Sequence, residues 1–198
     1  MPTPRSKETL EPSSRPGRRS WYVALLAAVA LQRLRELAIS RSNEAALGGA
    51  RAAPRTYPVM VAAHVGLLTL PLLEVAGRPA SRPRWRWAAV LAGATLLRVW
   101  SIRSLGRAWN VRASVPAHLS PVATGPYAYI RHPNYLAVAL EFAALPMIAG
   151  AWMSALGLSA LNAVVLVDRI REEERLLERS PAYRQAFATR ARFIPGVF

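Results

Sequence analysis

The segment 125–135, which reads GPYAYIRHPNY, concentrates side chains that could bind a charged cofactor. Pro133 disfavours helix at the preceding residue and suits the first position of a helix, so we predict that His132 is the last extended residue before a helix begins. The start of that helix offers free backbone N–H groups and a partial positive charge, and Arg131 adds a full one. Such a site suits a carboxylate or a phosphate. A turn at a membrane interface, with tyrosine anchors and a snorkelling arginine, explains these residues equally well.

A second cluster of ionisable side chains reads RIREEER over residues 169–175. On a helix, Arg169 and Glu173 lie four residues apart and therefore share one face. Glu173 and Glu174 point about 100° apart, so that one can face inward while the other faces outward. The cluster could hold a bound molecule, but a solvated helix carrying salt bridges is the simpler interpretation of the spacing alone.

The rest of the chain indicates which kind of protein positions these two clusters. Its 198 residues carry a formal net charge of +15, with 53% hydrophobic and 19% charged residues. Such a basic chain has either nucleic acid or a membrane surface as its usual partner. The segment 136–167 contains one ionisable residue, Glu141, and is longer than the roughly 20 residues that span a bilayer. We therefore predict an integral membrane protein that does not bind nucleic acid.

Two features of the composition bear on cofactors and on the source of the chain. The chain has no cysteine, which excludes disulfides, thiolate zinc sites, iron–sulfur clusters and a cysteine nucleophile. Its histidines are scattered, and we expect no bound metal. Lys7 is the only lysine among many arginines, and alanine is abundant, which is typical of a GC-rich bacterial genome. We therefore expect a bacterial inner-membrane protein.

The apolar runs and the residues that break them predict an all-α, polytopic membrane protein with about five transmembrane helices. A C-terminal helical hairpin turns at Gly150, and a charged helix over 168–180 leaves the membrane. Residues 1–20 are predicted to be a disordered basic arm. Residues 21–198 form the membrane domain, whose cofactor-binding part covers about 103–198. The expected transmembrane helices cover residues 21–39, 57–75, 85–102, 134–149 and 152–167.

The first apolar run and the orientation of the chain leave alternatives open. A basic arm, a short apolar core and the sequence AVA at 28–30 imitate a cleavable secretory signal, but helix-forming residues continue beyond it and favour a membrane helix. The side that holds 40–56, 103–135 and the C-terminus carries more basic residues, so the positive-inside rule makes that side, and the cofactor pocket, cytoplasmic. The same rule would also place the basic N-terminal arm on the cytoplasmic side. Five spans put the arm and the C-terminus on opposite sides of the membrane. Either the arm therefore lies outside or the first helix does not cross.

The two clusters together resemble the isoprenylcysteine carboxyl methyltransferase family and its bacterial relatives. The family pattern is Arg-His-Pro-x-Tyr, followed after a membrane hairpin by Arg-x-x-x-Glu-Glu. Residues 131–135 match the first part, and Arg169 with Glu173 and Glu174 matches the second. Short motifs are weak signals by themselves, but two in the right order around a hairpin are much stronger. The resemblance is strong over about 100–198 and weaker before it.

This resemblance implies a membrane enzyme, surrounded by membrane lipids, that transfers a methyl group from S-adenosylmethionine to a lipophilic acceptor. Arg169 would hold or orient the acceptor. Ala137 stands where the family often has glycine, and we expect this to loosen helix packing only slightly. The resemblance assigns to the cofactor Leu119, Ser120, Pro121, Val122, Tyr127, Arg131, His132, Pro133, Asn134, Tyr135, Glu173 and Glu174.

The acceptor must be an oxyanion or become one, because methyl transfer from a sulfonium is an in-line displacement. Eukaryotic members of the family methylate a prenylcysteine carboxylate. This chain is more similar to bacterial members that O-methylate phenolic or pyrone polyketide lipids, a likeness that extends to the segments 33–37 and 57–60. Arg169 could bind a carboxylate or lower the pKa of a phenol. Nothing in the sequence indicates an oligomeric state.

Two ionisable residues fall within predicted spans. A charged glutamate in a membrane is costly, so Glu141 is either paired or functional. Pairing with Asn162 or Arg98 is the simpler interpretation. In the alternative, Glu141 is a catalytic residue that bonds to an acceptor hydroxyl. For His64 we expect a neutral hydrogen bond between helices.

Membrane sterol and steroid reductases are the strongest competing class. They share the Arg-His-Pro-Asn-Tyr motif and a similar hairpin but use NADPH, and Asn134 fits their motif. Their hairpin is followed by an Arg-Asp-Glu type segment and by Lys-Tyr-Gly, whereas this chain has Glu173-Glu174 and SPAY at 180–183. We therefore favour the methyltransferase and keep the reductase and a non-enzymatic membrane protein as alternatives.

Overall fold

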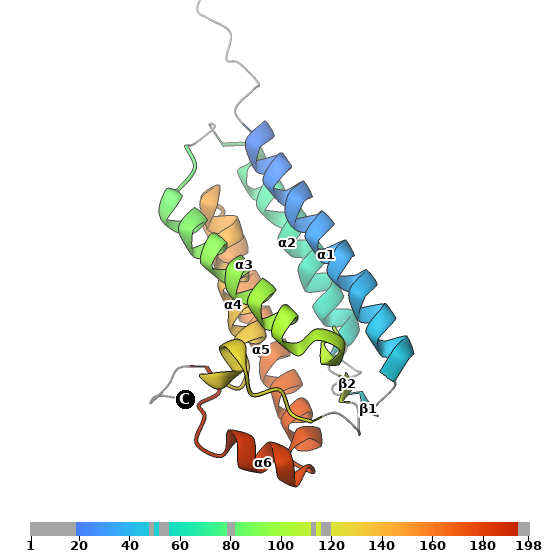
Figure 1. Cartoon of the computed structure of the whole chain (residues 1–198). Helices are drawn as coiled ribbons and strands as arrows, with labels where there is room; N and C mark the ends of the chain where they lie inside the picture. The colour runs from blue at the N-terminus through green and yellow to red at the C-terminus, as the bar shows by residue number, and fades with distance from the viewer. Residues whose placement is uncertain are drawn as a thin grey trace, which may run out of the picture.

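Five helices run side by side along one axis, and a sixth, shorter helix lies across one end of them (Figure 1). The computed structural model describes residues 19–47, 50–51, 56–78, 82–111, 114–115 and 120–193. The predicted disordered arm therefore falls almost entirely outside the described residues. The helices are α1 (Ser20–Leu47), α2 (Tyr57–Ala76), α3 (Trp85–Leu105), α4 (Pro133–Ile148), α5 (Trp152–Leu177) and α6 (Pro181–Phe187), with the short helices η2 (Gly106–Ala108) and η3 (Gly125–Ala128).

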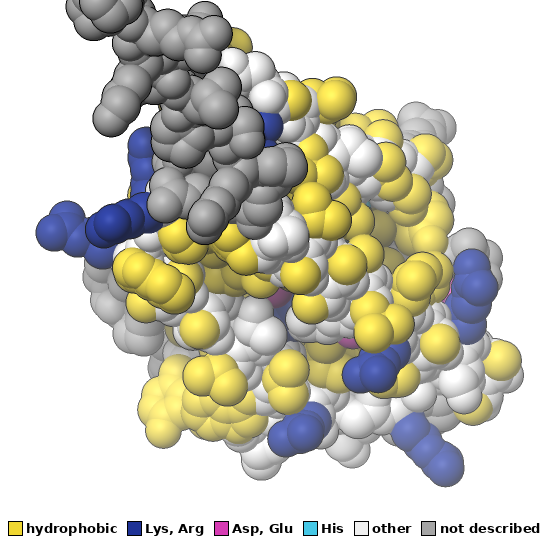
Figure 2. All heavy atoms as spheres, turned by 90° about the horizontal axis from the view of Figure 1, so that it is seen from above, with side chains coloured by type: hydrophobic (Ala, Val, Ile, Leu, Met, Phe, Trp, Pro, Cys, Tyr) yellow, Lys and Arg dark blue, Asp and Glu magenta, His cyan; other side chains and the backbone are white. Residues whose placement is uncertain are grey.

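Three helices are long and apolar enough to cross a membrane, namely α2, α3 with the turn that follows it, and α5. Helix α4 is apolar but shorter. Large apolar side chains cover the outside of these helices, with Leu73, Leu96 and Val164 each about 70% exposed. Seen along the bundle, hydrophobic side chains cover much of the surface, and arginines stand at its edge (Figure 2). The prediction of a helical bundle with helices able to cross a membrane is confirmed, while the number of about five spans stays a prediction.

The C-terminal hairpin forms where the sequence predicts it. Helix α4 begins at Pro133, as predicted, and His132 before it is outside the helix; with φ of −126° and ψ of 55° it is not fully extended, which corrects the prediction for this residue. The turn to α5 uses Gly150 at φ of +79°, a backbone conformation that residues with a Cβ rarely adopt. Phe142 and Leu145 of α4 are almost fully buried and pack in the core with Leu67 of α2. Helix α5 runs without a break from 152 to 177, so the predicted membrane helix and the charged helix after it are one element.

Helix α1 is longer at its C-terminal end than the predicted 21–39. Its polar extension is helical because it packs against the loop that follows α3. The Ser40 hydroxyl accepts the backbone N–H of Val111 at 2.8 Å, and the Asn43 amide donates to the carbonyl of Trp109 at 2.7 Å. Such partners, about 70 residues away in the chain, override the local preference of a polar segment.

A pair of two-residue strands, β1 (Ala50–Arg51) and β2 (Ser114–Val115), was not expected in an all-α protein. The strands pair antiparallel, with Ala50 opposite Val115. They connect the segment after α1 to the loop after α3, at the end of the bundle where the charged part of α5 and α6 also lie (Figure 1).

Candidate active site

A cavity of about 480 Å³ opens where the loop before α4 meets α1, α2, α3 and α5. Its volume falls in the range of small-molecule sites, about 300–1,000 Å³. Of the predicted site residues, Pro133, Glu141 and Glu174 do not line this cavity, and Leu119 lies outside the described residues. The predicted residues that do line it are Ser120, Pro121, Val122, Tyr127, Arg131, His132, Asn134, Tyr135, Arg169 and Glu173.

The C-terminal segment fixes the backbone of the loop that leads into α4. The N–H of Arg131 donates to the carbonyl of Ala191 at 2.9 Å, and the N–H of His132 donates to the carbonyl of Arg192 at 3.1 Å. Arg190 donates to the carbonyl of Tyr127 at 2.9 Å. The tail therefore bonds to the loop as an added strand would. This pairing orients the side chains of the loop toward the cavity.

Glu174 is occupied by partners within the protein. Both oxygens of its buried carboxylate accept from the Arg192 guanidinium, at 2.8–3.0 Å, and Oε1 lies 3.1 Å from Nε2 of His132. These hydrogen bonds raise the pKa of the Arg192 guanidinium. Glu173 points to the cavity instead, as the predicted angle between the two glutamates requires. The geometry thus gives Glu174 a positioning role for the loop, and its predicted contact with the cofactor stays a prediction.

Arg169 and Tyr135 form the polar wall of the cavity. Arg169 is only 3% exposed, and its Nη2 donates to the carbonyl of Val111 at 2.6 Å. Its Nε and Nη1 are buried and have no hydrogen-bond partner among the described residues. The guanidinium lies 5.9 Å from the ring centre of Tyr135, whose hydroxyl donates to Glu173. A buried cation with unsatisfied N–H groups is costly, so this position favours an anionic or strongly polar ligand.

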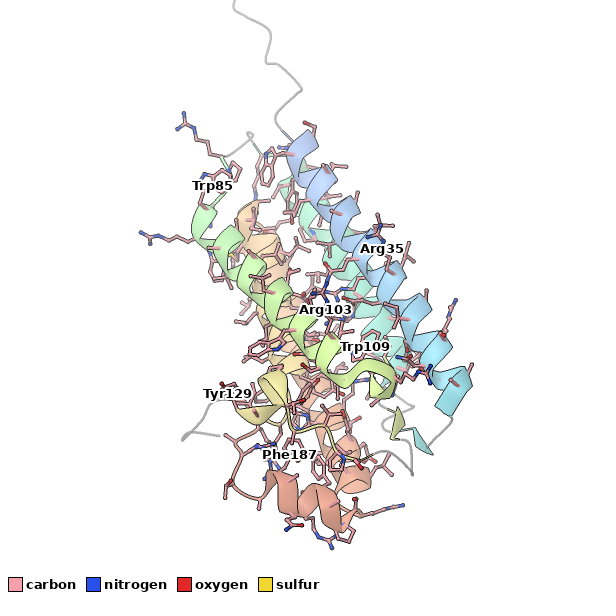
Figure 3. All side chains as sticks on the ribbon, viewed as in Figure 1. Arg35, Trp85, Arg103, Trp109, Tyr129 and Phe187 are labelled. Carbon is pink, nitrogen blue, oxygen red and sulfur yellow. The ribbon has the colours of Figure 1, made fainter. Side chains whose placement is uncertain are left out.

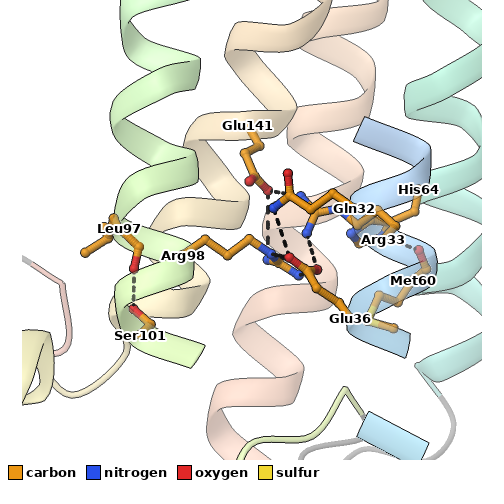
Figure 4. Close-up of polar contacts among 9 residues, drawn as sticks. All are labelled: Gln32, Arg33, Glu36, Met60, His64, Leu97, Arg98, Ser101 and Glu141. Carbon is orange, nitrogen blue, oxygen red and sulfur yellow. Dashed lines mark hydrogen bonds and ion pairs between the residues drawn. The ribbon is translucent and has the colours of Figure 1, made fainter. Parts of the chain in front are cut away.

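A group of four charged residues, which we call the charged quartet, lies deeper in the bundle and consists of Arg33, Glu36, Arg98 and Glu141 (Figure 4). Arg98 donates to both oxygens of Glu36, at 2.9 and 2.7 Å. Arg33 donates to Glu36 and to Glu141. Two partners were expected for Glu141, and one of them, Arg98, lies 3.8 Å from its carboxylate. The nearer partner is Arg33, which was not expected and takes the place of Asn162.

His64 lies beside the charged quartet, and the prediction of a hydrogen bond between helices is wrong for it. Its Nδ1 lies 2.8 Å from the carbonyl of Met60, one turn earlier on the same helix. Its ring packs edge-on against Phe142 of α4 with centroids 5.0 Å apart. An aromatic contact thus replaces the expected polar one between the two helices.

The remaining wall of the cavity is apolar and reaches the outside of the bundle between α1 and α2. It includes Leu34, Val61 and Val65, which are between 42% and 63% exposed and so face the surroundings of the bundle as well as the cavity. The cavity therefore has a polar end at the loop and an apolar end at the surface that would meet lipid.

Sequence reasoning missed Trp109 and Val111, which also line the cavity. Trp109 is 2% exposed, its Nε1 has no partner among the described residues, and its ring lies where α3 meets the end of α1 (Figure 3). A single tryptophan inside a polar loop was the available signal. Val111 acts through its backbone, which a sequence pattern does not show. In the described part of the chain, no group of three or more acidic or histidine side chains is placed to hold a metal ion.

The fold and the site define an α-helical membrane protein in which one cavity joins a charged loop site to a lipid-facing wall. The sequence model of the isoprenylcysteine carboxyl methyltransferase (ICMT) family matches residues 87–179. The protein YpbQ of Bacillus subtilis (strain 168), itself uncharacterized, is 32% identical over 160 residues, which cover 78% of this chain and 95% of YpbQ. The chain belongs to the ICMT family, a family of membrane methyltransferases, and the prediction from the two motifs is confirmed.

Proposed function

We propose that the protein is an S-adenosylmethionine-dependent O-methyltransferase that acts on a lipophilic acceptor at the cytoplasmic face of a bacterial inner membrane. The acceptor is a phenolic or pyrone polyketide lipid or a prenylcysteine-type carboxylate. The observation that carries this proposal is Arg169, a buried guanidinium with two unpaired nitrogens in the same cavity as the Arg-His-Pro-Asn-Tyr segment.

The residues at the polar end of the cavity fit S-adenosylmethionine. The Glu173 carboxylate suits the ammonium or the ribose hydroxyls, and Arg131 at the start of α4 suits the carboxylate. Asn134 offers a buried Oδ1 that has no partner among the described residues. Burial raises the pKa of the Tyr127 phenol above its usual range, so this side chain remains a neutral hydrogen-bond donor. When bound, the cofactor supplies an electrophilic methyl group on a sulfonium.

Arg169 would act on the acceptor. Positive charge beside a phenol lowers its pKa, and the effect is larger in a buried cavity than in water. A guanidinium with free N–H groups can therefore hold the acceptor oxygen as an oxyanion and orient it for in-line attack. The apolar wall formed by α1 and α2 would take the hydrocarbon part of the acceptor and exclude water from the reacting atoms.

The proposal is tested by titrating the detergent-purified protein, by calorimetry, with S-adenosylhomocysteine and separately with NADPH. We expect saturable binding of S-adenosylhomocysteine and none of NADPH. Tyr135→Ala and Glu173→Ala should abolish this binding, whereas Arg171→Gln, an exposed arginine on the same helix, should leave it unchanged. Binding of NADPH alone would favour the reductase, and binding of neither ligand would favour a non-enzymatic membrane protein.

A further inference from the structure

We propose that the charged quartet is a second polar binding site for the acceptor, which recognises an oxygen other than the one that receives the methyl group. This inference rests on the proposed function and narrows its acceptor class to lipids whose polar ring or head group carries at least two oxygens. Arg169 would take the oxygen that is methylated, and the quartet the oxygen that is not.

Three members of the quartet line the same cavity as Arg169, namely Arg33, Glu36 and Arg98. Arg98 is 5% exposed, and its Nη1 lies 3.8 Å from the Glu141 carboxylate but makes no hydrogen bond among the described residues. Nε of Arg33 is also buried and makes no hydrogen bond among them. Buried N–H groups of guanidinium ions that lack a partner are costly to the protein, so an oxygen of a ligand that accepts from them is favoured.

The formal charges of the quartet indicate which kind of oxygen suits it. Two arginines and two glutamates cancel, so the quartet needs hydrogen-bond acceptors for its spare N–H groups but no further negative charge. A neutral hydroxyl or carbonyl meets that need. The spare N–H groups of Arg169 belong to a cation whose Nη2 donates to a neutral carbonyl. An oxyanion is therefore the better partner there.

A purely structural role explains the quartet less well. It does join α1 to α3 and α4, but apolar side chains of similar size would hold buried helices together as well or better. Charged residues at membrane depth are costly and are usually paired with one another or placed on a ligand path. The quartet meets both descriptions, because its members pair with one another and also line the cavity.

The quartet and Arg169 lie at different levels of the bundle. Tyr135, which lies against Arg169, and Glu141, which pairs with Arg33 and Arg98, are six residues apart on α4, so these two α4 residues differ by about 9 Å along the helix axis. A benzene ring with two hydroxyls in meta positions spans a comparable distance when each oxygen makes one hydrogen bond. Leu34 on α1 and Val61 on α2 line the cavity beside the quartet and lead to the lipid-facing surface, where an alkyl chain would lie.

The test compares two lipids that differ by one hydroxyl, a resorcinol and a phenol that carry the same pentadecyl chain in the meta position. Binding of each to the protein saturated with S-adenosylhomocysteine is measured by quenching of tryptophan fluorescence. We expect the resorcinol to bind about 10- to 100-fold more tightly, the loss expected for one hydrogen bond to a charged group. Equal affinity of the wild-type protein for the two lipids would overturn the inference.

The variant that tests the assignment is the double substitution Arg33→Gln with Glu141→Gln. It removes both charges of one pair, because removing a single partner would leave an uncompensated charge in the membrane. We expect the affinity ratio of the two lipids to fall by at least about threefold, because the spare N–H of Arg33 is lost while that of Arg98 remains. The matched control is Glu74→Gln with Arg78→Gln, a pair 3.2 Å apart that does not line the cavity, and it should keep the wild-type ratio.

The outcomes separate this inference from the proposed function. If the quartet variant keeps the wild-type ratio, or if S-adenosylhomocysteine binds but neither lipid does, the inference is wrong while the methyltransferase proposal stands. Failure of S-adenosylhomocysteine to bind the wild-type protein would contradict the proposed function and this inference with it. If the double variant does not bind S-adenosylhomocysteine, it is replaced by Glu36→Gln with Arg98→Gln, which removes both charges of the other pair and the spare Nη1 of Arg98, and the affinity ratio should fall in the same way.

Discussion

Replacing Arg169 by methionine should make the protein inactive and at the same time more stable. Arg169 is 3% exposed, makes one hydrogen bond to the carbonyl of Val111 and leaves two nitrogens without a partner among the described residues. If these nitrogens hold the oxyanion of the acceptor, their removal should lower kcat about 100- to 1,000-fold, the cost of losing one positioned donor. Binding of S-adenosylhomocysteine should be unchanged.

The stability change follows from the same contacts. Each unsatisfied buried nitrogen costs about 1–3 kcal/mol, and the bond to Val111 returns about 1.5–3 kcal/mol. Methionine fills most of the volume without a charged or hydrogen-bonding group. The free energy of unfolding of the variant should therefore be about 1 kcal/mol higher than that of the wild type. For a chain of this length that corresponds to a rise in Tm of about 2–4 °C.

The assay is a thermal scan of intrinsic fluorescence in detergent without ligands, paired with transfer of labelled methyl groups to a lipid acceptor. Arg171→Met is the control, because Arg171 is exposed on the same helix and should change neither quantity. A fall in Tm together with loss of S-adenosylhomocysteine binding would mean that Arg169 is a structural residue. Unchanged turnover would refute its role toward the acceptor.

Three further predictions follow from neighbouring contacts. Tyr135→Phe removes the hydroxyl that donates to Glu173, so S-adenosylhomocysteine should bind about tenfold more weakly by calorimetry, with unchanged Tm as the control for folding. Ser40→Ala removes the hydroxyl that accepts the N–H of Val111, whose carbonyl accepts from Arg169, so kcat should fall severalfold while S-adenosylhomocysteine binding does not change; equal loss of both would contradict this role. Burial raises the pKa of Tyr127 and Tyr183, so their contribution to stability is complete below about pH 10 and is lost at higher pH. The Tm should fall above that pH, and less so in the variant with both residues changed to phenylalanine.

The parts of the fold that local chemistry determines were predictable from the sequence. The start of α4 at Pro133 follows from the effect of proline on its own residue and on the preceding one. The turn at Gly150 follows from the ease with which glycine adopts positive φ. Helix α2 was predicted at 57–75 and spans Tyr57–Ala76, because an apolar run of that length, interrupted only by His64 and Glu74, has few alternatives in a membrane. Arg169, which the motif indicated, lines the cavity, and its role toward the acceptor stays a prediction.

Contacts between distant segments were not predictable. Arg33 and Glu141 are 108 residues apart, and both have several possible partners in a membrane bundle. A single sequence carries no signal that couples two such positions. The extension of α1 through residues 40–47 depends in the same way on a distant loop that a local pattern cannot supply. The role of Glu174 was also inaccessible, because its partner Arg192 lies in the tail and is brought to it by the folding of α6.

Helix α1 connects the two proposed acceptor sites. It is bonded to the rest of the bundle at three levels, by Tyr22 at its start, by Arg33 and Glu36 near its middle, and by Ser40 in its last turns. The first bond lies in the apolar core, the second level lines the cavity, and the third holds Val111, which lines the cavity. A displacement of α1 would therefore alter the quartet and the loop that orients Arg169 together. Recognition of the second oxygen of an acceptor and orientation of the first would then be coupled through one helix, so an acceptor that lacks the second oxygen should lose turnover as well as affinity.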